Sequence, residues 1–104
     1  MRQIWQQNDT GPPLEATLLG PDRRPINLVG KSVEFHMTPF DSEVRKVEAA
    51  ATVVTAEGRV QYQPTAADTD TIGIFRGSFR VWDDESDISY PNASYFLVEV
   101  TDDI

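Results

Sequence analysis

Apolar and polar residues alternate along much of the chain, and the alternation is most regular between residues 73 and 82. One side of this segment carries apolar residues and a glycine: Phe75, Gly77, Phe79 and Val81. The other side carries Arg76, Ser78 and Arg80. Because successive side chains of a β-strand point to opposite faces, this period of two indicates a strand with one buried face. Residues 60–63 alternate in the same way. A corner rich in Pro, Asp, Thr and Gly separates them from the segment 73–82. The pattern predicts two antiparallel strands that each offer an apolar face to a second sheet.

Residues 32–38 predict another regular strand. Its inward side chains are apolar: Val33, Phe35 and Met37. Its outward side chains are Glu34, His36 and Thr38, which we expect to be solvated. Pro39 ends the strand because proline has no N–H to give to the ladder.

The remaining predicted strands are shorter and are separated by turn-forming residues. Residues 95–100 form the last strand, with three apolar side chains on its inner face: Phe96, Val98 and Val100. Other apolar segments lie at 4–5, 14–19, 26–28 and 88–90. About seven or eight short strands, with turns roughly every 8–12 residues, are typical of a β-sandwich.

Residues 44–55 are ambiguous. The first part contains good helix formers, and Val44, Val47 and Ala51 fit a helical stripe. The β-branched residues Val53 and Val54 favour a strand instead. We favour one strand, or two short strands broken near Glu48.

Composition limits the classes of function. The 104 residues form one predicted domain, 1–104, and they include no cysteine, so disulfides and thiolate chemistry are excluded. The formal net charge of −8 repels phosphate backbones and anionic membranes, so we expect neither nucleic acid nor membrane as a partner. The N-terminal residues lack the apolar segment of a signal peptide. We expect a protein that is made in a cytoplasm.

The search for catalytic or metal-binding residues returns little. His36, the one histidine, is predicted on an outward strand face without a nucleophile beside it, so we do not expect catalysis. The acidic segment 83–87 lacks the Gly and Glu of a calcium loop and is predicted to be a hairpin turn. Asp68 and Asp70 could hold a cation, but we expect them to cap backbone N–H groups in the corner before residue 73. We expect no enzyme, no metal and no cofactor.

Aromatic and arginine side chains are the best candidates for contact with other molecules, since both are enriched at binding surfaces. The candidates for protein contact are Trp5, Arg23, Arg24, Trp82 and Tyr95. An alternative is a carbohydrate- or host-surface-binding module that uses Trp82, Tyr90 and Tyr95.

Two resemblances refine the fold. Residues 70–75 are similar to the corner of immunoglobulin-like domains in which Asp and Gly precede a tyrosine, although Phe75 replaces that tyrosine. The order of motifs also resembles the N-terminal domain of the siphophage baseplate upper protein. The resembling segments are PINLVGKSVEFHM at 25–37, GRVQY at 58–62, GIFRGSFRV at 73–81 and FLVEV at 96–100.

The resemblance implies an all-β, immunoglobulin-like antiparallel sandwich that serves as a structural module of the virion. Such a domain docks on the tail or baseplate core and supplies no catalytic residue. Because the chain ends at Ile104, we expect a separate structural or decorating subunit of the tail, baseplate or head-to-tail region. Its partners would be other virion proteins, contacted repeatedly through symmetry.

Overall fold

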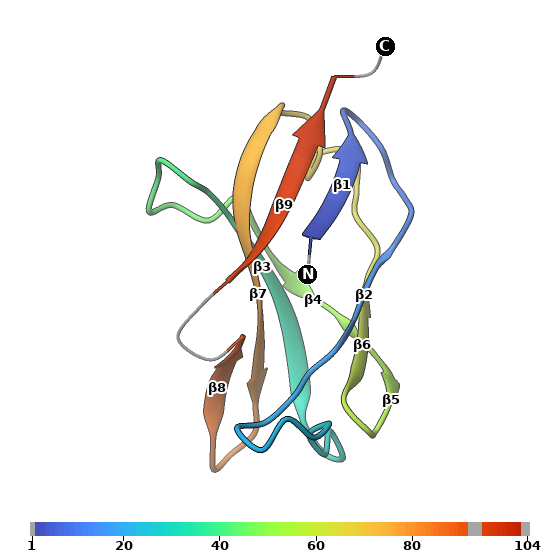
Figure 1. Ribbon diagram of the computed structural model, residues 1–104, viewed down its shortest axis with the longest axis vertical. Helices are drawn as coiled ribbons and strands as arrows, with labels where there is room; N and C mark the ends of the chain where they lie inside the picture. The colour runs from blue at the N-terminus through green and yellow to red at the C-terminus, as the bar shows by residue number, and fades with distance from the viewer. Residues whose placement is uncertain (1, 92–94, 103–104) are drawn as a thin grey trace.

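The chain folds into two β-sheets that face one another, as the computed structural model in Figure 1 shows. The structure describes residues 2–91 and 95–102, and within them there are nine strands and no helix. In these residues no helix is long and apolar enough to cross a membrane. The larger sheet has the order β1-β9-β7-β3-β4, and β8 pairs with the second half of β7. Its strands are β1 (Arg2–Gln6), β9 (Phe96–Thr101), β7 (Gly73–Trp82), β3 (Ser32–Pro39), β4 (Val47–Ala50) and β8 (Asp87–Tyr90). The smaller sheet has the order β2-β6-β5, with β2 (Leu14–Thr17), β6 (Arg59–Tyr62) and β5 (Thr52–Thr55).

An aromatic cluster fills the space between the sheets. The ring of Phe35 on β3 stacks on Tyr62 of the opposite sheet, with the ring centroids 4.6 Å apart. Phe79 lies 5.5 Å from Phe35, and Phe96 lies 5.8 Å from Phe79. Because these side chains come from both sheets, the stacked aromatic rings hold the two layers together.

The predicted strands at 73–82, 32–38 and 95–100 are confirmed, and so are their inward faces. All the inward apolar residues of these three segments are buried: Phe75, Phe79, Val81, Val33, Phe35, Met37, Phe96, Val98 and Val100. Residues 26–28 are not part of a named strand, although Leu28 is buried. The all-β prediction is therefore confirmed, with nine described strands in place of seven or eight.

Two strands lie within residues 44–55, as in the second of the alternatives left open, and they start at Val47. The predicted break near Glu48 is wrong, because Glu48 lies within β4 and the break falls at Ala51. β4 pairs with β3 in the larger sheet, whereas β5 pairs with β6 in the smaller one. The backbone N–H of Ala51 donates to Val33 O at 3.0 Å, which anchors the chain as it leaves the larger sheet. The sequence of this segment shows no single regular alternation because the chain passes from the larger sheet to the smaller sheet within it.

The corner between β6 and β7 is a hydrogen-bonded turn built around Asp68. Its carboxylate accepts the backbone N–H of Thr65 at 2.9 Å and the hydroxyl of Tyr62 at 2.5 Å. Burial and this neighbouring carboxylate raise the pKa of the Tyr62 phenol. The next residue, Thr69, is buried and donates its hydroxyl to Asp9 O at 2.7 Å. The predicted capping role of Asp68 is confirmed, and the corner is tied to the turn after β1. The Asp70 carboxylate instead accepts from Lys46 Nζ at 2.6 Å and from the Thr71 hydroxyl at 2.8 Å.

Asp83 organises the hairpin turn between β7 and β8. One carboxylate oxygen accepts the backbone N–H groups of Glu85 and Ser86, each at 2.8 Å, and the other contacts Lys31 Nζ at 2.7 Å. The Lys31 ammonium, followed by the two N–H groups, holds the pKa of Asp83 well below its usual range. The acidic segment is thus a turn in which the Asp83 oxygens bind groups of the chain itself.

We expect Asp83→Asn to make folding stability less dependent on acid. Since the folded-state pKa is depressed, the ionised form stabilises the protein above about pH 4, and this contribution is lost as the pH falls through the folded-state pKa. The variant should be slightly less stable at neutral pH, and its thermal midpoint should fall less steeply on acidification. Asp84→Asn is the matched control, because it removes a charge one residue away. Parallel midpoint-against-pH curves for the wild type and Asp83→Asn would contradict the expectation.

Candidate protein-contact face

The outer face of the larger sheet carries exposed apolar side chains on the half that contains β1, β9 and the start of β7, which is the upper half in Figure 1. The strand registers place Ile4 on β1 and Ile74 on β7 on either side of Glu99 on β9. Both isoleucines are about half exposed, at 51% and 52%. Leu97 lies on the same face of β9, two residues before Glu99. Glu99 is bound by Arg2, which neutralises the one charge between the isoleucines.

Two aromatic side chains extend this face. Phe40 follows β3, and its backbone N–H donates to Ile74 O at 3.2 Å. The ring of Phe40 meets the ring of Tyr95 edge to face, with the centroids 5.4 Å apart, and each side chain is 46% exposed. We refer to the whole set as the apolar patch: Ile4, Phe40, Ile74, Tyr95 and Leu97. Side chains of this kind, left exposed over neighbouring strands, mark a surface that another protein can cover.

The lower half of the same face is polar. Arg80 on β7 holds Asp87 on β8 through two hydrogen bonds of 2.9 and 2.8 Å. Its guanidinium carbon lies 4.3 Å from the ring centroid of Trp82 and covers that ring. The ion pair lowers the pKa of Asp87 and raises that of Arg80. The charged and aromatic side chains at this end of the face therefore contact one another, in contrast to the apolar side chains of the patch.

His36 points outward as the alternation of β3 predicted, but it is not solvated. The residue is on the outward face of β3, but it is only 5% exposed, so the expectation of a solvated histidine is wrong. The physical reason is that β3 is an inner strand, with β4 and β7 on its two sides. Glu34 Oε1 lies 2.7 Å from Nε2 of the ring, and Glu48 of β4 lies directly opposite His36.

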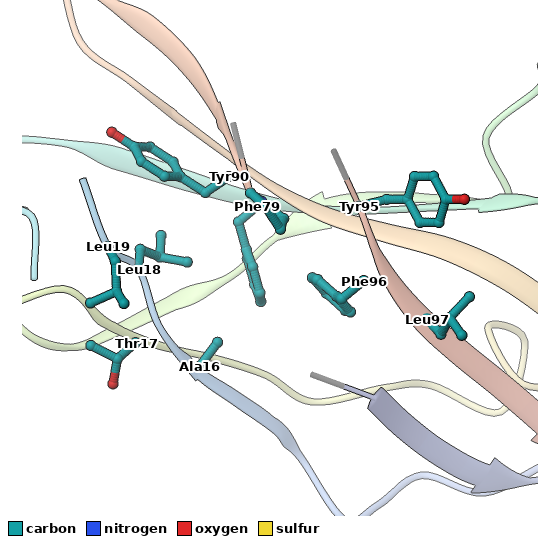
Figure 2. A pocket seen from close by; sticks show the side chains of 10 residues that line it. Ala16, Thr17, Leu18, Leu19, Phe79, Tyr90, Tyr95, Phe96 and Leu97 are labelled. Atoms are coloured by element: carbon teal, nitrogen blue, oxygen red, sulfur yellow. The ribbon is translucent and has the colours of Figure 1, made fainter. Parts of the chain in front are cut away.

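A groove of about 360 Å³ opens along one side of the molecule, between β2 and the strands β8 and β9. Figure 2 shows Phe79 and Phe96 opposite Ala16 and Leu18, which come from the other sheet. Within the described residues, the outer edges of β2 and β8 are not paired with another strand. The groove lining has no carboxylate, histidine or lysine among its described residues, so it suits apolar contact better than acid–base chemistry.

Among the five predicted contact residues, Trp5 is wrongly placed by the sequence interpretation. It is 1% exposed, and its indole N–H donates to Pro12 O at 2.7 Å, so it is a core residue. The alternation of β1 places it inward, opposite Val100 of β9.

The other four predicted residues are divided between two regions. Trp82 and Tyr95 lie on the outer face of the larger sheet. Trp82 ends β7, whereas Tyr95 immediately precedes β9, whose first residue pairs with Gly77 near the middle of β7. Arg23 and Arg24 are exposed in the turn between β2 and β3, away from the apolar patch. Tyr90 lines the groove in Figure 2 and therefore does not share a surface with Trp82.

Four residues of the apolar patch were not predicted as contacts: Ile4, Phe40, Ile74 and Leu97. Each is an apolar residue at an outward position of a strand or just after one, where the alternation calls for a polar residue. An apolar residue at a position where the alternation predicts a polar one is therefore the sequence feature that could have identified these four contacts. Their proximity could not be read from the sequence, because it depends on which strands are neighbours.

The sequence matches none of the known protein-family models, and a search of curated proteins finds no match either. The motifs, the fold and these surfaces therefore provide the basis for inferring its function.

Proposed function

We propose that this chain is a non-enzymatic structural subunit of a phage virion, in the tail, the baseplate or the head-to-tail region, and that it acts through protein–protein contacts. Its partners are other virion proteins, and neither nucleic acid nor membrane is required. The ordered motifs that resemble the baseplate upper protein provide the sequence support. The net charge of −8 suits a partner with a basic surface.

An immunoglobulin-like topology belongs to this proposal, and the strand order supports it. In such domains one sheet contains strands G, F and C, with C′ added in the variable type, and the other contains A, B, E and D. If β2 is taken as B and the later strands are lettered in chain order, with β8 as an extra hairpin strand, the smaller sheet is B-E-D. The larger sheet is G-F-C-C′, with β1 paired in parallel to the outer side of G. The unpaired outer edge of β2 is then the position that strand A covers in those domains.

The apolar patch is the observation that carries the contact function. Three of its side chains come from the strands β1, β7 and β9 of one sheet, so the surface is broad and backed by ladder hydrogen bonds. A partner that covers it would remove several half-exposed apolar groups from water, at a gain of roughly 25 cal/mol per Å² before the costs of association. Tyr95 and Phe40 are rigid aromatic groups of the kind that dominate interface energies.

Purified virions provide the direct test of the proposed location. We expect the chain to be present in particles in a fixed number of copies, detectable by mass spectrometry and by immunogold labelling. Its absence from purified particles would overturn the proposal.

We expect Ile74→Asp to weaken binding to the virion partner by about tenfold or more, since loss of an interface residue worth about 1.4 kcal/mol has this effect. The side chain points outward, so the fold should survive at a cost of about 1 kcal/mol. Val54→Asp is the matched control, because Val54 is 45% exposed and lies on the smaller sheet. Affinity can be measured by calorimetry with the purified partner. An equal loss of affinity in both variants would contradict the assignment of the docking face.

A further inference from the structure

Glu34, His36 and Glu48 bring three metal-type ligands together on the outer face of the larger sheet. Glu34 and His36 are two residues apart on β3 and therefore share a side of the strand. Glu48 on β4 lies directly opposite His36 in the antiparallel register. The three ligand atoms all lie within 4.8 Å of one another. The cluster is thus built by two hydrogen-bonded strands, not by a loop.

The burial of these side chains leaves one side of the cluster open. The His36 side chain is 6% exposed, and Glu34 is 20% exposed. Glu48 is 52% exposed, so its carboxylate can move without disturbing the core. The imidazole nitrogen Nε2 is directed at Glu34, with 2.7 Å between Nε2 and Oε1. The buried nitrogen therefore lies beside one partly buried and one half-exposed carboxylate.

The local charges leave the carboxylates incompletely neutralised. Arg80 Nη1 is 3.9 Å from Glu34, but its two close hydrogen bonds go to Asp87. Arg45 Nη1 is 3.4 Å from Glu48, and the Arg45 side chain is half exposed. Three carboxylates thus face two guanidinium groups, and a cation bound at the cluster would offset the difference.

We propose that Glu34, His36 and Glu48 bind a zinc ion. Zinc accepts imidazole nitrogen and carboxylate oxygen at about 2.0–2.2 Å, and three protein ligands with an open fourth position are common. Tetrahedral bonds of this length place donor atoms about 3.5 Å from each other. The Glu34 carboxylate therefore has to turn away from its 2.7 Å contact with Nε2 while Glu48 swings inward. Calcium needs six to eight oxygen ligands, which this cluster does not offer. The inference does not depend on the proposed virion role.

The competing arrangement is a His36 ring hydrogen-bonded to Glu34 without metal. Both arrangements use His36 and Glu34, but only a metal site gives saturable zinc binding that needs Glu48. Because the chain has one histidine, its ring signals in a proton NMR spectrum report on His36 without further assignment.

The experiment uses the full chain without an affinity tag, stripped by a chelator and titrated with zinc chloride. We expect one equivalent to bind by calorimetry, with a shift of the His36 ring signals that saturates at the same ratio. Glu48→Ala should weaken binding by about tenfold or more, as loss of a metal-site residue commonly does, and the exposed position protects the fold. Glu57→Ala, an exposed glutamate on the β5–β6 turn, should bind as the wild type does. Absence of saturable binding, ring signals that do not move, or wild-type affinity in Glu48→Ala would each overturn the proposal.

Discussion

Replacing Phe35 with alanine should lower the free energy of unfolding by about 3–5 kcal/mol, the range for buried aromatic residues. Phe35 is fully buried, and its ring contacts both the opposite sheet, through Tyr62, and its own sheet, through Phe79. The truncation would leave a cavity between layers that cannot close without bending both sheets. Since domains of this size have about 5–15 kcal/mol of total stability, the variant should be close to unfolding at physiological temperature.

Denaturant unfolding followed by tryptophan fluorescence measures this loss. Phe40→Ala is the matched control, because the same side chain is removed from a half-exposed position. We expect the control to change stability by less than about 1 kcal/mol, although it should weaken partner binding. If Phe35→Ala were no more costly than Phe40→Ala, the two sheets could not be packed through Phe35.

The second large effect is expected at Gly77, where even alanine should be poorly tolerated. A Cβ atom at this position would lie 2.5 Å from Cε2 and 2.8 Å from Cζ of the Phe96 ring. Phe96 is directly opposite Gly77 in the β7–β9 register, and its ring is held against Phe79 and Phe35. The ring could yield only toward the groove that it lines, and it would lose its stacking on Phe79 and Phe35. Gly77→Ala should therefore cost about 1–3 kcal/mol through overpacking.

A double-mutant cycle distinguishes this steric conflict from a general preference for glycine. Phe96→Leu removes part of the ring that the new methyl group would meet. We therefore expect Gly77→Ala to cost less in the Phe96→Leu background, with a coupling free energy of about 1 kcal/mol. Additive costs in thermal or denaturant unfolding would show that the Phe96 ring is not the obstacle.

Strand β3 shows what the alternation of apolar and polar residues can predict and what it cannot. In β3 the pattern identified Val33, Phe35 and Met37 as inward, and all three are buried. The same pattern made His36 an outward residue, which is correct as a direction but wrong as a statement about exposure. Being outward means being solvated only at a sheet edge or where neighbouring side chains are short, and β3 has a strand on each side.

The surfaces were harder to predict than the core. Tyr95 and Trp82 were identified as contact candidates from residue type, and both lie on the outer face of the larger sheet. Trp5 was also selected by type, but it is an inward residue of β1 and belongs to the core. The apolar patch was missed because Ile4 and Ile74, which are far apart in the sequence, come together only through the pairing of both β1 and β7 with β9.

The amino-acid sequence alone determined that the chain is all-β, where its main strands run and which side of each is apolar. These properties are local, because they follow from a side-chain period of two and from the turn residues between strands. Only the tertiary structure decided that β4 and β5 belong to different sheets, that His36 is covered and that Glu48 lies opposite it. Those properties depend on strand neighbours and register, which join residues that are distant along the chain.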